Sequence, residues 1–245
     1  MRLAISGTAN IGKSTVIQDF LKEWPGYSTD TKTYRDILKE KNLPHSQSTN
    51  KETQWAILNH MVDSLQTRTK RDKVIFDRCP LDNIVYSIWA MGKGGSDIDK
   101  EFIDKCIPLV RESIKFLDII FFIPITKVAP VAIVEDGIRD TDQEFIQEID
   151  NIMKTIVHTH RIKVGSTPFL AAYDCPPIIE LFGAPQERIQ MIRNYIDADG
   201  DLIGDNTSMS TAGTHDMQAL VEQMGVQLEK EKNQARLLKK FSIKR

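Results

Sequence analysis

The residues Gly7-Thr8-Ala9-Asn10-Ile11-Gly12-Lys13-Ser14 form a complete G-x-x-x-x-G-K-S pattern near the start of the chain. They follow a short apolar run, Leu3-Ala4-Ile5, and lead into a helical pattern. A strand, a glycine-containing loop and a helix in this order point several backbone N–H groups at one spot, where the helix N-terminus adds a partial positive charge. The stretch therefore predicts a phosphate-binding loop that holds a nucleoside triphosphate.

Each residue type in this loop has a physical role. Gly7 and Gly12 let the backbone turn and approach the phosphates closely. Lys13 would reach the β- and γ-phosphates, and the Ser14 hydroxyl would ligate Mg²⁺. The alternative is a chance match in an ordinary glycine turn, but the full pattern stands in the strand–loop–helix context that it requires. ATP and Mg²⁺ are thus the predicted cofactors. The predicted nucleotide-binding residues are Gly7, Thr8, Ala9, Asn10, Ile11, Gly12, Lys13, Ser14 and Thr15.

The bulk composition is that of an ordinary globular protein. A chain of 245 residues suits one α/β domain with length to spare for a tail. The formal net charge of −2 gives no signal for nucleic acid or membrane, and no apolar run approaches the ~18 residues that span a bilayer. Three widely spaced cysteines indicate free thiols in a reducing compartment. Because the N-terminus enters the first strand directly, no signal peptide is expected. The prediction is a soluble cytoplasmic protein.

Strand and helix patterns alternate along the chain. The predicted strands cover residues 3–5, 27–30, 73–77, 118–123 and 177–182. The predicted helices cover residues 13–24, 34–41, 51–69, 80–91, 98–116, 143–163 and 185–196, with a polar loop at 42–50 and a glycine break at 92–95. This order predicts a three-layer α/β sandwich of the P-loop NTPase type, in which a five-stranded parallel sheet binds its ligand at the carboxyl ends of the strands.

Composition also predicts the domain organisation. Residues 1–196 form the predicted nucleotide-binding domain, and its irregular, charged segment at about 127–142 is lid-like. Residues 197–213 are rich in Asp, Gly, Ser and Thr and indicate a polar linker. Residues 214–245 indicate a basic C-terminal helix, either a solvated helix or one that contacts a phosphate backbone.

A second group of functional residues follows the apolar run VIFD. Asp77 ends this predicted strand, and Arg78 is next to it. An acid at a strand end near the loop can hold Mg²⁺ through water or accept a proton from an attacking hydroxyl, and the arginine can clamp a phosphate. Alternatively, both residues only cap the helix that begins at Pro80. We predict Lys13, Asp77 and Arg78 as catalytic residues, and Ser14 and Asp77 as the Mg²⁺ site.

The segments GTANIGKST and VIFDRCPLDNIVYSIW resemble the thymidylate kinase and deoxynucleoside kinase group of P-loop kinases, over about residues 1–196. This resemblance implies an ATP-dependent kinase with Asp77 and Arg78 at the phosphoryl-acceptor site, where Cys79 replaces the usual hydroxyl residue. It also implies a mobile lid whose arginine closes over the transferring phosphoryl group, and Arg139 is the candidate. A plain surface turn is the alternative at that place. The turn 183–188 resembles the loop that packs on the nucleotide base.

The acceptor is expected between the second strand and the helices that follow it. A carboxylate there could hold a hydroxyl, an arginine could hold an acidic group, and a glutamine could read a pyrimidine edge. Asp30, Arg35 and Gln54, together with Arg78, are the predicted substrate-binding residues, and each of the first three has a plain surface role as its alternative. Trp55 is a candidate stacking surface for a base.

The family resemblance leaves several acceptors open. It extends to phage-encoded kinases that phosphorylate the 5-hydroxymethyl group of 5-hydroxymethyldeoxyuridine within DNA, which is the preferred interpretation and implies the host cytoplasm. The alternatives are a free thymidylate or deoxynucleoside monophosphate kinase and a P-loop NTPase that only hydrolyses or senses nucleotide. An acceptor in DNA predicts a wide basic groove, whereas a free nucleotide predicts a closed pocket. A GTPase is disfavoured because Asn50-Lys51-Glu52-Thr53 lacks the guanine-reading pattern. ATP, a pyrimidine deoxynucleotide and a homodimer are the expected partners, without a membrane.

Overall fold

The computed structural model describes residues 1–69, 71–126, 142–163 and 165–204. Within these ranges, residues Met1–Asp201 form one compact unit. The strands are β1 (Arg2–Ser6), β2 (Ser28–Thr29), β3 (Val74–Asp77), β4 (Ile119–Phe122) and β5 (Ile178–Glu180). The helices are α1 (Lys13–Glu23), α2 (Tyr34–Lys41), the 3₁₀ helix η1 (Ser46–Ser48), α3 (Lys51–Gln66), α4 (Pro80–Lys93), α5 (Lys100–Ile114), α6 (Gln143–Ile162) and α7 (Pro185–Ile192).

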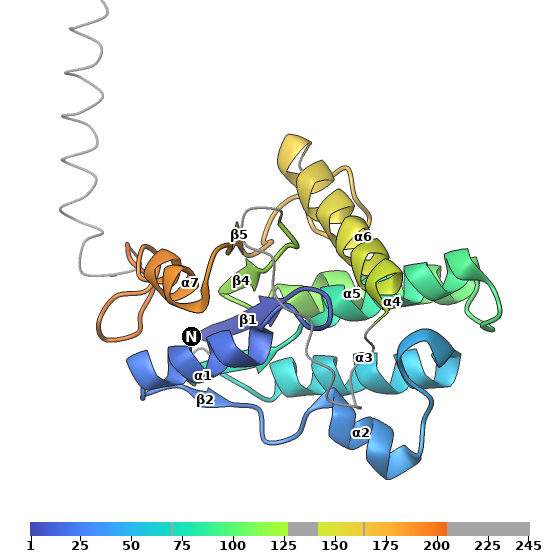
Figure 1. Ribbon diagram of the computed structural model, residues 1–245, viewed down its shortest axis with the longest axis horizontal. Coiled ribbons are helices and arrows are strands. Elements are labelled where there is room, and N and C mark those ends of the chain that lie inside the picture. The colour runs from blue at the N-terminus through green and yellow to red at the C-terminus, as the bar shows by residue number, and fades with distance from the viewer. Residues whose placement is uncertain (70, 127–141, 164, 205–245) are drawn as a thin grey trace, which may run out of the picture. The chain divides into compact units, whose positions relative to one another are not determined.

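The five strands form one parallel sheet in the order β2-β3-β1-β4-β5 (Figure 1). The central strand β1 is buried along its whole length, as expected for a parallel strand that is covered on both faces. In the register of β1 with β3, Ile5 lies beside Asp77. The loop that follows β1 and the acid that ends β3 therefore leave the sheet side by side.

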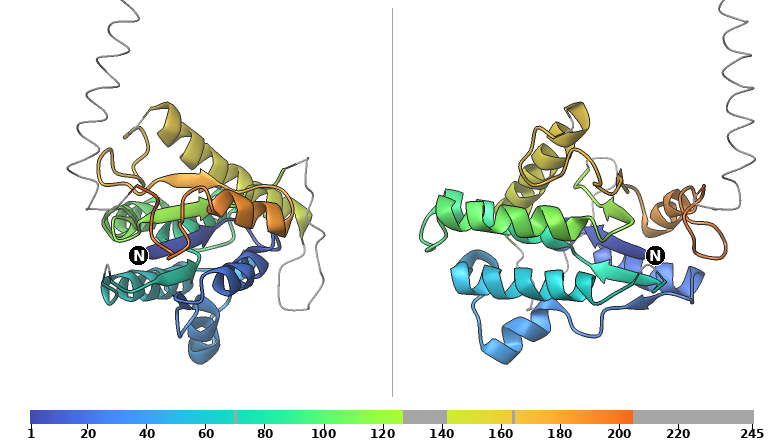
Figure 2. Two further views of the ribbon diagram at one scale, coloured as in Figure 1. Left: turned by 90° about the vertical axis from the view of Figure 1, so that its left-hand side faces the viewer. Right: turned by 180° about the vertical axis from the view of Figure 1, so that it is seen from behind.

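Helices cover both faces of this sheet, and Figure 2 shows α1 and α7 on one face and α3, α4 and α5 on the other. Because side chains alternate along a strand, neighbouring residues enter different layers. Ala4 and Phe76 pack in one hydrophobic cluster with α3, α4, α5 and α6. On the other face, the ring of Phe121 contacts Tyr195, just after α7. The predicted three-layer sandwich with a five-stranded parallel sheet is confirmed.

The element boundaries differ from the predicted ones in a few places. The helix predicted to break at Gly92 continues to Lys93, because the chain leaves helical geometry only at Gly94 and Gly95, with φ of 72° and 81°. The α3 helix ends at Gln66, and the segment predicted as a plain loop contains η1. The sequence pattern predicted these elements correctly but located their ends less accurately, because helix ends depend on local capping.

The chain beyond α7 returns to the domain before the described residues end. The indole Nε1 of Trp24 donates to the carbonyl of Asp197 at 2.7 Å, and the Tyr27 hydroxyl donates to the carbonyl of Gly200 at 2.7 Å. Residues 197–201, expected to begin the linker, thus belong to the compact unit. The rest of the predicted linker beyond residue 204, the basic helix, and Arg139 with nearly all of the predicted lid lie outside the described residues. In the described part of the chain, no helix is both long and apolar enough to cross a membrane.

Candidate active site

The phosphate-binding loop is shaped by residues in left-handed backbone conformations. Gly7 has φ of 134°, Asn10 of 58° and Gly12 of 81°. A Cβ atom on Gly7 would lie 2.7 Å from the carbonyl oxygen of Ile123, so glycine is required there. Gly12 is the N-cap of α1, which means that the loop delivers the chain directly into the helix N-terminus. This is the arrangement that the sequence predicts for a phosphate cradle.

Lys13 lies inside this loop with only 7% of its surface exposed. Its ammonium group donates to the carbonyl of Thr8 in the same loop. Burial, together with repulsion from the Arg78 guanidinium, lowers the pKa of Lys13 to about 7, although Asp77 and Asp82 partly oppose the shift. Since a triphosphate carries negative charge, its arrival would restore the charged form of this lysine.

A buried ion pair holds the first glycine of the loop. Asp82 Oδ1 accepts from the backbone N–H of Gly7 at 3.1 Å and from Arg78 Nη1 at 3.1 Å. Arg78 Nη1 also donates to the carbonyl of Gly7 at 2.9 Å. The second oxygen of Asp82 accepts from the N–H of Cys79 at 2.9 Å. Both polar groups of Gly7 are therefore fixed by the turn that follows β3.

The Arg78 side chain is enclosed by aromatic rings as well as by this ion pair. Its guanidinium carbon lies 5.0 Å from the centre of the Tyr86 ring and 5.6 Å from that of Tyr34. Its Nη2 donates to the Tyr86 hydroxyl at 3.1 Å. Arg78 was predicted to clamp a phosphate. In this structure its hydrogen bonds go to the loop, Asp82 and Tyr86, so the guanidinium supports the loop and contributes a fixed positive charge.

Asp77 stands at the carboxyl end of β3 with one oxygen available. Its Oδ1 is buried and has no hydrogen-bond partner among the described residues. Ser14, in the first turn of α1, lines the same cavity as Asp77. An orphaned carboxylate oxygen and a hydroxyl near a phosphate-binding loop are suitable donors for Mg²⁺, which usually also keeps water and phosphate oxygens. Within the described residues there is no cluster of three or more acidic, histidine or cysteine side chains that would form a complete metal site by itself.

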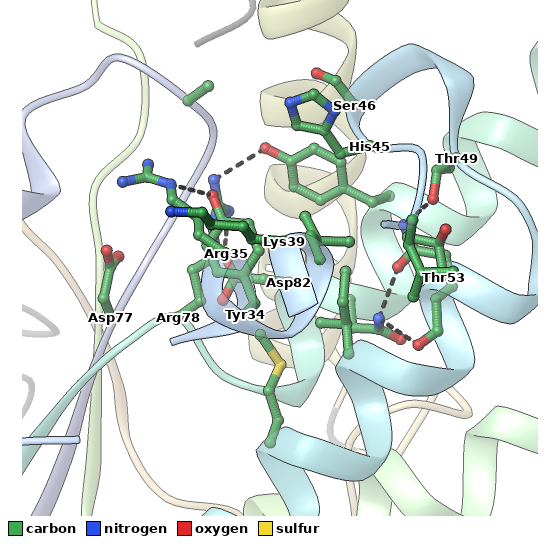
Figure 3. A pocket seen from close by; sticks show the side chains of 18 of the residues that line it. Tyr34, Arg35, Lys39, His45, Ser46, Thr49, Thr53, Asp77, Arg78 and Asp82 are labelled. Atoms are coloured by element: carbon green, nitrogen blue, oxygen red, sulfur yellow. Dashed lines mark hydrogen bonds and ion pairs between the residues drawn. The ribbon is translucent and has the colours of Figure 1, made fainter. Parts of the chain in front are cut away.

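A cavity of about 430 Å³ extends from the loop into the space between α2, α3 and α4. Figure 3 shows Asp77 and Arg78 at one end of it and Thr49 and Thr53 at the other. The residues of the phosphate-binding loop that line it are Ala9, Asn10, Gly12, Lys13 and Ser14. Gly7, Thr8 and Ile11 are buried and do not line this cavity, and Thr15 is exposed. The cavity thus joins the predicted nucleotide site to the region where the acceptor was expected.

Besides Arg78, two other predicted acceptor residues, Arg35 and Gln54, line this cavity. The Arg35 side chain is exposed, and its Nε donates to the Tyr34 hydroxyl at 3.2 Å. Gln54 is buried, with Nε2 donating to Thr49 Oγ1 at 2.7 Å and Oε1 accepting from Asn83 Nδ2 at 2.6 Å. Because Asn83 Nδ2 also donates to the Gln54 backbone carbonyl at 2.9 Å, the orientation of both amides is fixed. Gln54 is therefore an ordered polar group in the cavity wall.

Asp30 and Trp55 are not brought into this cavity. Asp30 lines a neighbouring cavity of about 360 Å³, where it accepts from the Ser64 hydroxyl and forms an ion pair with Arg68 at 3.6 Å. Trp55 packs against α5, with the Lys105 ammonium 4.5 Å from its ring centre. The expectation that Trp55 offers a stacking surface in the acceptor site is wrong, because helical spacing alone did not show that this face of α3 meets α5.

Several residues of the site were not predicted. Asp82 carried one available signal, since an acid three residues after an N-cap forms a capping box with the N-cap backbone. Its second role, as the acceptor for the Gly7 N–H, required the fold. Tyr34, Asn83 and Tyr86 reach the cavity from α2 and α4, and no sequence spacing links them to the loop.

Comparison with solved structures supports a kinase-like nucleotide-binding fold. Deoxyadenosine kinase from M. mycoides matches with a TM-score of 0.57 at 16% identity, covering 79% of this chain and 97% of that one. NadR in complex with NR matches with a TM-score of 0.50 at 16% identity and 71% coverage, and this chain spans about half (48%) of the NadR chain. Thymidylate kinase from Candida albicans matches with a TM-score of 0.48 at 14% identity, covering 79% and 89% of the two chains. At these identities the similarity concerns the fold.

A search of curated proteins gave no match. The protein-family comparison matched residues 2–168 to the AAA domain family. The match includes the phosphate-binding loop, the sheet through β4, and the Asp77–Arg78 turn, which is most of the compact unit. The chain therefore belongs to the AAA domain family, and its fold is similar to those of solved nucleotide kinases.

Proposed function

We propose that this protein is an ATP-dependent kinase that transfers the γ-phosphoryl group of Mg·ATP to a hydroxyl group of a free nucleoside or nucleotide. The observation that carries the proposal is the single cavity that contains Lys13, Ser14 and Asp77 at one end and Gln54 at the other. Transfer of a phosphoryl group from ATP needs a loop that holds the triphosphate and an acid near the acceptor hydroxyl. It also needs a binding region for the acceptor that opens directly onto the loop.

The end of the cavity at the phosphate-binding loop, here called the donor end, would act through the charges and positions of its residues. Lys13 and the loop amides would neutralise the β- and γ-phosphates, while Ser14, with Asp77 through water, would hold Mg²⁺. When bound, Mg²⁺ lowers the charge repulsion that the incoming hydroxyl must overcome. Arg78 keeps the loop in place through Gly7 and adds a fixed positive charge at the end of β3. Arg139 remains the predicted lid arginine.

The part of the cavity that runs from Asp77 to Gln54, here called the acceptor end, would orient the attacking hydroxyl. The Asp77 carboxylate lines the cavity and its Oδ1 has no partner among the described residues, so the carboxylate could accept a hydrogen bond, and then the proton, from a hydroxyl bound there. Gln54 lies in the wall beyond it, held by Thr49 and Asn83. Within the described residues its amide makes one of its two possible donations and one of its two possible acceptances, and the remaining donor and acceptor suit the edge of a nucleobase.

The size of the cavity favours a free acceptor over one within DNA. A volume of about 430 Å³ lies in the range typical of small-molecule sites. Helices α2, α3 and α4 surround it, and Trp55, the candidate stacking surface for a base in DNA, packs on α5 instead. The structural relatives also point to small acceptors, since one contains dCMP as a product and another is a complex with NR.

The test is a phosphorylation assay with labelled ATP and a panel of acceptors. The panel contains deoxynucleosides, deoxynucleoside monophosphates including thymidylate, NR, and DNA with 5-hydroxymethyluracil. We expect label transfer to a member of the free nucleoside or nucleotide group. Asp77→Asn should lower kcat about a hundredfold, because an amide cannot accept the proton. Asp104→Asn, an exposed acid on α5, is the matched control and should leave kcat unchanged.

Two outcomes would contradict the proposal in different ways. Label transfer to DNA alone would restore the DNA-modifying interpretation. Hydrolysis of ATP at the same rate with and without every acceptor, unaffected by Asp77→Asn, would indicate a P-loop NTPase that is not a kinase.

A further inference from the structure

Arg188, in the first turn of α7, joins two parts of the chain that lie far apart in sequence. Its Nη1 donates to the carbonyl of Ile11 in the phosphate-binding loop at 2.7 Å. Its Nε donates to the carbonyl of Gly183, in the turn before α7, at 3.0 Å. The contact is consistent with the packing of α7 beside α1 (Figure 1). One planar guanidinium thus holds two backbone oxygens from different elements.

The guanidinium of Arg188 is buried, and within the part of the chain that the structure describes its hydrogen bonds go to backbone carbonyls rather than to a carboxylate. The side chain is 3% exposed, and no carboxylate of a described residue forms an ion pair with it. Burial lowers the pKa of Arg188, in keeping with the cost of removing a cation from water. A buried cation is normally paired. Here the site next to it is built for a polyanion, so a bound triphosphate would supply the missing negative charge.

The contact with Ile11 also determines the direction of an amide in the loop. In a trans peptide the C=O and the following N–H point in opposite directions. Holding the Ile11 carbonyl therefore fixes the direction of the Gly12 N–H. Gly12 has φ of 81°, and a glycine at this place allows the preceding peptide to rotate at little cost. The loop needs a contact that prevents this rotation, and Arg188 provides it.

We propose that Arg188 is a positioning residue for nucleotide binding: it locks the Ile11–Gly12 peptide so that the Gly12 N–H faces the phosphates, and it contributes a buried positive charge beside them. The inference rests on the proposed function only in requiring that a polyphosphate binds the loop. The Gly12 position supports it, because a Cβ atom there would lie 3.3 Å from Arg188 Nη1, so the two residues fit closely.

The test compares three variants of the full chain by equilibrium binding of Mg·ATP and of magnesium tripolyphosphate. Tripolyphosphate has no base, so it reports on the loop alone. Arg188→Ala should weaken both ligands by about tenfold or more, since it removes charge-assisted hydrogen bonds. Arg188→Lys keeps the charge but not the planar fork, and should recover part of the loss. Arg193→Ala is the matched control, because this exposed arginine follows α7 and pairs with Glu23.

Chemical rescue distinguishes positioning from general destabilisation. Guanidinium chloride, far below the concentrations that unfold proteins, should restore affinity to Arg188→Ala and have no such effect on the unaltered protein. If Arg188→Ala fails to fold, Arg188→Lys alone must show the intermediate affinity for tripolyphosphate. Unchanged affinity in Arg188→Ala, or a loss that neither lysine nor guanidinium repairs, would overturn the inference. Failure of the unaltered protein to bind either ligand would instead refute the proposed function.

Discussion

The phosphate-binding loop and the acceptor cavity meet at Asp77 but are built in different ways. In the loop, side chains act on backbone groups: Asp82 and Arg78 hold Gly7, and Arg188 holds Ile11. In the acceptor cavity, side chains from α2, α3 and α4 act on one another, as Gln54 does with Thr49 and Asn83. A loop that binds the same triphosphate in many proteins can be built from main-chain amides, whereas selection among acceptors requires side chains that differ.

The largest expected effect is the loss of phosphotransfer when the donor end is altered. Lys13→Ala should lower phosphotransfer about a thousandfold with every acceptor, because it removes a charged donor from the transferring phosphoryl group. The fold should remain, since the change also removes a buried group that prefers to lose its charge. Steady-state kinetics measures the phosphotransfer rate, and circular dichroism measures whether the fold is retained. Lys22→Ala, an exposed lysine on the same helix, is the control. Turnover retained by Lys13→Ala would refute the assignment of the loop.

The next prediction concerns the ion pair that supports the loop. Asp82→Asn preserves the shape of a side chain that is 1% exposed but removes the charge that offsets Arg78. The free energy of unfolding should fall by about 3 kcal/mol, because the buried guanidinium is left without its partner. Denaturant titration measures this change. Asp104→Asn, whose ion pair with Lys100 is exposed, should shift it by less than about 1 kcal/mol. Equal stability of the two variants would mean that the Arg78–Asp82 pair does not support Gly7.

These two ends of the site also differ in how far the sequence predicts them. The loop was predicted residue by residue because its eight positions are adjacent and each has a separate chemical reason. Asp77 and Arg78 were predicted because parallel strands end at one edge, so a polar residue after an apolar strand has a known location. Asp82 and Arg188 were missed as supports of the loop because their partners lie 75 and 177 residues away.

The acceptor end was less predictable for a related reason. Gln54 and Trp55 are neighbours on α3, yet Gln54 lines the cavity and Trp55 packs on α5. Their positions differ by one residue, about 100° around a helix, and only the packing of α3 between α4 and α5 determines which face is which. Asp30 follows β2 as expected, but Arg68 and Ser64 hold it in the neighbouring cavity.

A third prediction tests whether the acceptor end acts independently of the donor end. Gln54→Leu should raise the acceptor KM about tenfold, through the loss of hydrogen bonds to the acceptor. The KM for ATP should not change, because among the described residues the Gln54 side chain bonds to Thr49 and Asn83 and not to the phosphate-binding loop. Initial-rate kinetics with each substrate varied in turn will separate the two constants. Gln66→Leu, at the exposed end of the same helix, is the control. A parallel rise in both KM values would show that the two ends are coupled through α3.

The smallest expected effect is the uptake of a proton when the nucleotide binds. In the free protein burial lowers the pKa of Lys13 to about 7, and bound phosphates would raise it again. Above pH 7 the complex therefore holds a proton that the free protein has lost, so the affinity for Mg·ATP should fall as pH rises, by at most about one log unit per pH unit. Calorimetric titration in two buffers of different ionisation enthalpy will measure this uptake. At about pH 5.5 Lys13 is already charged and the uptake should disappear. An affinity independent of pH between these limits would mean that Lys13 is fully charged before the nucleotide arrives. In that case both the charge of Lys13 and the backbone of the loop would already be in their binding state before the nucleotide arrives.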